Sequence, residues 1–203
     1  MTLLELLSRN KNYSFNSDPG TDKESQHYYV SSFYDEAFLP YKEKEVNVLE
    51  IGINTGGSLL LWRDYFINGK IFGVDLINCI QRPYDFSFGD YPYEYVDTVN
   101  FKNIKMFFED AYSEVFLSKI PSMDIIIDDG PHSFESQIKC LNMFLPKLKT
   151  NGLFVIEDIA DLNYIKDFEK LISKIDSPVR TEIIDTREQY NNFDNIIFAV
   201  WKL

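Results

Sequence analysis

Two short acidic motifs carry side chains whose types and spacing could do chemistry. The first is Asp128-Asp129-Gly130-Pro131-His132 and the second is Glu157-Asp158. Each follows an apolar run typical of a buried parallel strand, so we expect both motifs at the carboxyl edge of a sheet, where ligands bind. Carboxylates gathered there repel one another unless a cation neutralises them, and oxygen ligands favour Mg²⁺. His132 has a side chain whose usual pKa suits a general base.

Helix capping is the alternative explanation for these carboxylates. Asp129 stands just before a helix expected from about Ser133, and Asp158 precedes another expected helix. One such cap would be ordinary, because Asp often accepts hydrogen bonds at a helix start. The whole constellation favours a cation site over capping, while a purely structural role for His132 stays open.

A glycine-containing turn follows an earlier apolar run, residues 46–51. Gly52 and the glycines after it allow a sharp turn close to a ligand, and Asp75 ends the next expected strand. An acid at that position can accept hydrogen bonds from ribose hydroxyls. The dinucleotide fingerprint lacks its middle glycine here, and the Glu50 carboxylate would repel a pyrophosphate. The turn therefore favours a positively charged ligand such as S-adenosylmethionine, and a turn without a ligand is the alternative.

Apolar runs and amphipathic segments alternate along the chain and would position these motifs. Strands are expected at residues 46–51, 70–75, 104–108, 123–128, 152–157, 182–185 and 195–201. Helices are expected at residues 24–39, 58–66, 113–120, 134–145 and 163–175. Such alternation predicts an α/β fold, with a mostly parallel seven-stranded sheet and helices on both faces. The last two strands are joined by a polar link, so the C-terminal strand should be antiparallel.

Composition and charge exclude several classes of protein. The chain has 203 residues, 45% of them hydrophobic, and a formal net charge of −12. This charge argues against binding nucleic acid or an anionic membrane surface, because both would be repelled. Two cysteines cannot build a disulfide framework. No apolar run reaches the roughly 18 residues of a membrane span, and the N-terminus is a poor signal peptide, so we expect a cytoplasmic protein.

Residues 78–100 form a long excursion between two expected strands. Six aromatic residues, spaced about two apart, lie between Tyr84 and Tyr95. The segment could be a flap packed on its own domain or on a second copy, and it could instead be a lid facing the substrate. Packing on a second copy would make the protein a homo-oligomer.

Taken together, these motifs resemble one family, the class I S-adenosylmethionine-dependent O-methyltransferases of the macrocin and mycinamicin sugar type, which are often grouped with cephalosporin hydroxylase-like proteins. The resemblance rests on residues 20–23, 27–28, 34, 48–52, 57–66, 73–75, 124–132 and 151–158. It implies a Rossmann-like methyltransferase fold that uses S-adenosylmethionine and Mg²⁺. It also implies methyl transfer to a hydroxyl of a sugar or of a glycosylated metabolite.

The resemblance also assigns roles to individual residues. Asp129, Glu157 and Asp158 correspond to metal ligands, and Asp129 and His132 are the expected catalytic residues. The expected cofactor-binding residues are Thr21, Lys23, Glu50, Gly52, Asn54, Gly57, Ser58, Asp75, Leu76, Asp110, Ala111 and Asp128. One departure weakens the adenine contact, because the family's Gly-Asp-Gln after the third strand reads Glu109-Asp110-Ala111 here. Residues 1–40 are expected to be a helical segment covering the cofactor site, and residues 41–203 the methyltransferase domain.

Two alternative functions stay open at this point. A catechol or phenolic O-methyltransferase would use the same fold and similar metal carboxylates, with an aromatic diol as acceptor. A non-catalytic cofactor-binding subunit that supports a partner enzyme would have no need of His132. The expected substrate is the hydroxyl of a small molecule or glycan, with neither nucleic acid nor membrane as a partner.

Overall fold

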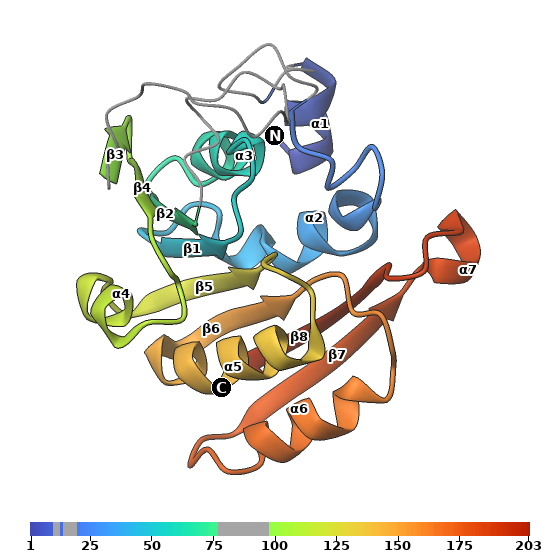
Figure 1. Ribbon diagram of the computed structural model, residues 1–203. Helices are drawn as coiled ribbons and strands as arrows, with labels where there is room; N and C mark the ends of the chain where they lie inside the picture. The colour runs from blue at the N-terminus through green and yellow to red at the C-terminus, as the bar shows by residue number, and fades with distance from the viewer. Residues whose placement is uncertain (10–12, 14–19, 77–97) are drawn as a thin grey trace, which may run out of the picture.

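A mostly parallel sheet forms the centre of the molecule (Figure 1). The computed structural model describes residues 1–9, 13, 20–76 and 98–203. The sheet has eight strands in the order β3-β4-β2-β1-β5-β6-β8-β7. Their bounds are β1 Asn47–Ile51, β2 Lys70–Asp75, β3 Thr98–Phe101, β4 Ile104–Phe108, β5 Met123–Asp128, β6 Leu148–Ile156, β7 Val179–Asp185 and β8 Ile196–Lys202. The predicted fold class is confirmed, and the short strand β3 extends the seven expected strands by one.

The direction of the strands brings the sequence motifs to one edge. β4, β2, β1, β5 and β6 are parallel neighbours, whereas β8 runs antiparallel to both β6 and β7, as the polar link predicted. In the register of the sheet, Ile51 at the end of β1 lies beside Asp128, and Asp128 lies beside Ile156. The residues that follow these three strand ends therefore emerge at the same level, including the glycine turn and both acidic motifs.

Helices cover both faces of the sheet and bury two apolar cores. One core lies under α1, α3 and the N-terminal turns, and the other lies under α4, α5 and α6 (Figure 1). The helices are α1 Leu3–Arg9, α2 Asp35–Ala37, α3 Gly57–Tyr65, α4 Glu114–Lys119, α5 Phe134–Phe144, α6 Tyr164–Ile172 and α7 Arg187–Tyr190. Single turns add η1 Val30–Tyr34, η2 Leu39–Tyr41 and η4 Leu145–Lys147. Among the described residues, no helix is long and apolar enough to cross a membrane.

The helix expected at residues 24–39 begins later than predicted. Residues 23–26 form turns, Tyr28 has a φ of 56°, and regular helical structure starts only at Val30. Lys23 and Tyr29 are both buried by contacts with carboxylates at the edge of the sheet, and these tertiary contacts replace the first helical turns. Most of the aromatic excursion, residues 78–97, lies outside the described residues, and residues 98–100 belong to β3.

Candidate active site

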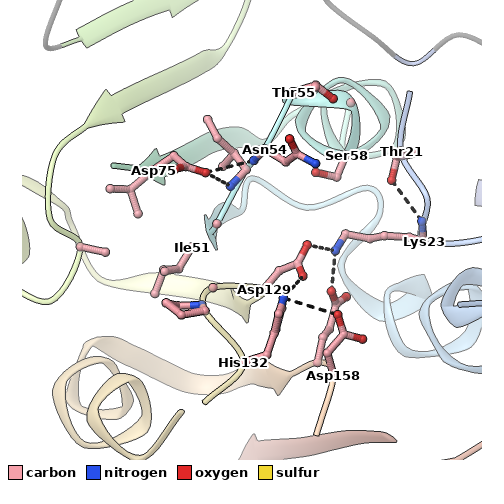
Figure 2. A pocket seen from close by; sticks show the side chains of 18 of the residues that line it. Thr21, Lys23, Ile51, Asn54, Thr55, Ser58, Asp75, Asp129, His132 and Asp158 are labelled. Carbon is pink, nitrogen blue, oxygen red and sulfur yellow. Dashed lines mark hydrogen bonds and ion pairs between the residues drawn. The ribbon is translucent and has the colours of Figure 1, made fainter. Parts of the chain in front are cut away.

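A cavity of about 460 Å³ opens at the carboxyl edge of the parallel strands. Figure 2 shows side chains from the glycine turn, from the N-terminal segment and from the ends of β2, β5 and β6 pointing toward it. The expected site residues that line it are Thr21, Lys23, Gly52, Asn54, Gly57, Ser58, Asp75, Leu76, Asp110, Ala111, Asp129, His132, Glu157 and Asp158. Two of the expected residues, Glu50 and Asp128, are absent from the lining.

Asp75 organises the part of the cavity next to the glycine turn. Its Oδ2 accepts hydrogen bonds from the backbone N–H of Ile53 at 3.0 Å and of Asn54 at 3.1 Å. The carboxylate thus fixes the turn, and an acid at the end of this strand is the group that could accept hydrogen bonds from a ribose. Leu76, the next residue, is 66% exposed and offers an apolar surface at the rim.

The loop after β4 supplies a second wall to this part of the cavity. Glu109 is engaged by Lys119, whose Nζ lies 2.7 Å from both carboxylate oxygens. Asp110 is exposed, and its Oδ1 accepts a hydrogen bond from the backbone N–H of Tyr112 at 2.8 Å. Of the two adjacent acids, Asp110 is therefore the one left to meet a polar ligand group.

The turn after β1 packs directly against the turn after β5. Gly52 has a φ of 81°, a left-handed conformation that favours glycine. A Cβ atom at this position would lie 1.9 Å from the backbone oxygen of Asp129. Glycine is therefore required at position 52 both by its backbone conformation and by the close approach of the two turns.

Glu50 is buried behind the turn and does not line the cavity. Its Oε2 accepts hydrogen bonds from Ser58 Oγ at 2.6 Å and from Trp62 Nε1 at 3.1 Å, and its Oε1 lies 3.1 Å from Lys23 Nζ. Direct contact of Glu50 with a positively charged ligand stays a prediction. The carboxylate ties β1 to the first turns of α3 and to the N-terminal segment.

Asp128 is the second expected cofactor residue that faces away from the cavity. Successive side chains of a strand point to opposite faces, and Asp128 lies on the face covered by α5, near Cys140 and Tyr112. Burial raises the pKa of this carboxyl to about 7. Within the described structure its Oδ2 has no hydrogen-bond partner, which is consistent with a carboxyl that is easily protonated.

Asp129, His132 and Asp158 form a cluster that could hold a metal ion. Each offers a ligand atom within 4.8 Å of the others. His132 Nε2 lies 3.8 Å from Asp129 Oδ1 and 3.6 Å from Asp158 Oδ2 (Figure 2). Burial, with Asp129 close by, raises the pKa of Asp158. Two carboxylates converging at a cavity wall are the hard oxygen donors that Mg²⁺ prefers, so the residues present fit this ion.

Two residues of the cluster have unusual backbone conformations. His132 has a φ of 58° and Asp158 a φ of 52°. Such values are uncommon for residues other than glycine and often occur at functional sites, where the surrounding structure compensates their cost. Here they turn two consecutive loops so that both side chains reach the same point.

Glu157, the third expected metal ligand, lies beside this cluster. Its Oε2 is 2.6 Å from Lys23 Nζ, and its Oε1 accepts a hydrogen bond from the Tyr34 hydroxyl. Both oxygens therefore face the N-terminal segment. Each oxygen retains a further lone pair, so these contacts leave it able to bind a cation.

Two residues of the N-terminal segment, which the sequence did not single out as site residues, also reach the cluster. The Tyr29 hydroxyl donates to Asp158 Oδ1 at 2.5 Å, and His27 Nδ1 lies 3.5 Å from the same oxygen. His27 Nδ1 is also 2.9 Å from Asn195 Oδ1, which links the segment to the loop before β8. Their position directly after the Gly20-Thr21-Asp22-Lys23 motif was the available signal for a functional role.

The sheet order, with its antiparallel C-terminal strand and its cavity at the carboxyl edge, defines a Rossmann-like methyltransferase fold. A solved structure of the same fold is the MycE methyltransferase from the mycinamycin biosynthetic pathway in complex with Mg, S-adenosylhomocysteine (SAH) and mycinamycin VI. It aligns with a TM-score of 0.68 and 24% identity over 100% of this chain and 54% of that chain. No family model matches the sequence.

Curated relatives are named as sugar O-methyltransferases. The 8-demethyl-8-alpha-L-rhamnosyl tetracenomycin-C 2'-O-methyltransferase of Streptomyces olivaceus is 29% identical over 147 residues, 69% of this chain and 35% of that protein. The mycinamicin VI 2''-O-methyltransferase of Micromonospora griseorubida is 29% identical over 143 residues, 65% of this chain and 32% of that protein. The resemblance predicted from the motifs is therefore confirmed, and the chain spans about a third of the length of these relatives.

Proposed function

We propose that this protein is a Mg²⁺-dependent O-methyltransferase that moves a methyl group from S-adenosylmethionine to a hydroxyl of a sugar or a glycosylated small molecule. The observation that carries the proposal is the shared cavity: the Asp129–His132–Asp158 cluster opens into the space bounded by the glycine turn and Asp75. The names of the relatives support a sugar hydroxyl as acceptor.

The cofactor would lie along the ends of β1, β2 and β4. Asp75 is placed to accept hydrogen bonds from a ribose, while Leu76 and Ala111 would enclose the adenine and Asp110 would meet its amino group. The role of S-adenosylmethionine in this reaction is to supply an electrophilic methyl group. The chain's contribution is to hold that group in line with the acceptor oxygen, which can account for a large share of the rate.

The carboxylates of Asp129, Glu157 and Asp158 would hold the metal. Mg²⁺ at this place would lower the pKa of a bound hydroxyl by Lewis-acid activation. Asp129 and Asp158 already converge on one point, and Glu157 lies next to them at the end of β6. These residues would thus orient two neighbouring hydroxyls of the acceptor, an arrangement that a sugar diol offers.

His132 is the proposed general base. Its side chain is about one third exposed at the cavity wall, and its Nε2 faces both Asp129 and Asp158. A neutral hydroxyl is a weak nucleophile, so an imidazole that accepts its proton assists methyl transfer.

The N-terminal residues 1–40 are proposed to cover the cofactor site. Thr21 and Lys23 line the cavity, and Gly57 at the start of α3 lies so close to Thr21 that an added Cβ would be 2.6 Å from the Thr21 backbone nitrogen. The segment is held there by the ion pairs of Lys23 and by the hydroxyls of Tyr29 and Tyr34. It would therefore exclude water from the reacting groups.

Comparing methyl transfer to glycosides with methyl transfer to catechol tests the proposal. Purified protein is incubated with S-adenosylmethionine and Mg²⁺ and offered a set of rhamnosides and other glycosides, with catechol as the comparison. We expect formation of SAH with glycosides, loss of product with chelator, and little product with catechol. If catechol were methylated faster than the glycosides, the proposed acceptor would be a phenol instead of a sugar.

A further inference from the structure

Lys23 is a buried lysine surrounded by carboxylates from three strands of the sheet. Its Nζ lies 2.6 Å from Glu157 Oε2 and 3.1 Å from Glu50 Oε1. It also lies 2.8 Å from Asp129 Oδ2 (Figure 2). The residue is only 2% exposed. One ammonium group thus joins the ends of β1, β5 and β6.

The charge on this lysine follows from its surroundings. Its ammonium lies within ion-pair distance of the carboxylates of Glu157, Asp129 and Glu50. A buried charge is tolerated only when it is paired and hydrogen-bonded. The structure therefore holds a fixed positive charge at the base of the cavity.

The three carboxylates around Lys23 have two different roles: one is structural, and two are proposed to bind the metal. Glu50 holds α3, the helix after the glycine turn, through Ser58 and Trp62, whereas Asp129 and Glu157 are proposed metal ligands. Carboxylates that bind a metal are commonly held by hydrogen bonds from neighbouring residues, and losing such a bond often weakens metal binding. The ammonium contacts only one oxygen of each partner, so lone pairs for a cation remain.

We propose that Lys23 is a positioning residue that orients Asp129 and Glu157 for the cation and, through Glu50, anchors both to β1 and α3, the two elements joined by the glycine turn. The inference rests on the proposed function. It differs from the expectation that Lys23 contacts the cofactor, because its ammonium is already enclosed by the three carboxylates.

Two views of Lys23 predict opposite changes in Mg²⁺ affinity when the residue is removed. If Lys23 only added positive charge, or if its ammonium took the place of the metal, removing it would tighten Mg²⁺ binding, because like charges repel. If Lys23 orients the carboxylates, removing it weakens binding. The direction of the change in Mg²⁺ affinity therefore decides between the two.

The experiment is calorimetric titration of Mg²⁺ into wild type, Lys23→Met and the control Lys149→Met. Lys149 is ion-paired with Asp124 at 2.7 Å, away from the cavity, so its loss should leave Mg²⁺ affinity unchanged. For Lys23→Met we expect Mg²⁺ affinity to fall about 10- to 100-fold. Far-UV circular dichroism and thermal unfolding are measured in parallel to verify that each variant is folded.

A second variant covers the case in which Lys23→Met does not fold. Lys23→Met/Glu50→Gln removes one charge of each sign and so leaves the net charge of the buried cluster unchanged, yet Asp129 and Glu157 still lack their donor. We expect weak Mg²⁺ binding here too. Unchanged or tighter Mg²⁺ binding in either folded variant would overturn the role of Lys23. Failure of the wild type to bind Mg²⁺ would instead contradict the proposed function.

Discussion

At the scale of single residues, the proposed chemistry depends on His132 and on the carboxylates around it. His132 Nε2 lies within 4 Å of an oxygen of both Asp129 and Asp158, and the backbone of His132 is held in a left-handed conformation to bring it there. Removing His132 and removing one of the carboxylates should therefore affect different steps. The base should matter for turnover, and the carboxylates should matter for cation binding.

Replacing the base should separate catalysis from cofactor binding. We expect His132→Ala to bind SAH as wild type does, because the turn and Asp75 are untouched, but to lose about 10²- to 10⁴-fold in turnover. Single-turnover methyl transfer to the best glycoside measures this. Turnover equal to that of wild type would remove His132 from the mechanism.

Replacing one carboxylate should abolish the cation site. Asp129→Asn keeps the shape of the side chain but loses its charge, so we expect no measurable Mg²⁺ isotherm and little activity. Asp124→Asn is a matched control, because Asp124 lies on the same strand β5 but pairs with Asn47 and Lys149. An Asp129→Asn variant that still responds to Mg²⁺ would refute the ligand assignment.

The buried carboxyl of Asp128 should make stability depend on pH. Burial raises its pKa to about 7, so in the folded state it keeps its proton at pH values where the unfolded chain has lost it. The folded state therefore loses relative stability as pH rises from about 4 to about 7, by up to about 4 kcal/mol, and the loss levels off above that range. Denaturant unfolding in chelator should show this slope in wild type and a flatter profile in Asp128→Asn. Equal slopes in the two proteins would show that Asp128 is ionised in the folded state.

At the scale of elements, two turns position the site. The turn after β1 and the turn after β5 touch at Gly52 and Asp129, so the cofactor side and the cation side of the cavity are built against each other. The register of β1, β5 and β6 aligns their ends, which places Glu157 and Asp158 beside these turns. A change at the contact should therefore disturb both functions together.

Gly52→Ala tests this coupling. The added Cβ would meet the Asp129 backbone at 1.9 Å, so we expect loss of both SAH and Mg²⁺ binding and a lower melting temperature. Asn151→Ala is the control, since Asn151 also has a positive φ of 60° but is exposed and outside the cavity lining. Normal ligand binding by Gly52→Ala would mean that the two turns can separate without consequence.

The elements of the sheet could be predicted from the sequence, but the contacts of the N-terminal segment could not. Apolar runs marked the parallel strands, and acids at their ends marked the carboxyl edge. The segment from Gly20 to Tyr29 has no such periodic signal, because Lys23 and Tyr29 are positioned by distant carboxylates. The sequence could not show that Glu50 and Asp128 lie outside the cavity lining, because a strand-end acid can face either side of the sheet.

At the scale of the whole molecule, the cavity is lined by a cluster of carboxylates and is bounded on one side by the N-terminal segment. The chain carries a net charge of −12, which suits attraction of a cation and of a positively charged sulfonium cofactor. The N-terminal segment closes one side through Lys23, Tyr29 and Tyr34. The cofactor and the metal should therefore bind to neighbouring but separable sites within one cavity.

Binding of SAH measured by calorimetry, once with Mg²⁺ and once with chelator, tests the central claim most directly. The account predicts tight binding in both conditions, together with a separate Mg²⁺ isotherm that disappears in Asp129→Asn. Absence of SAH binding in both conditions would contradict a methyltransferase and leave the cavity to a different ligand.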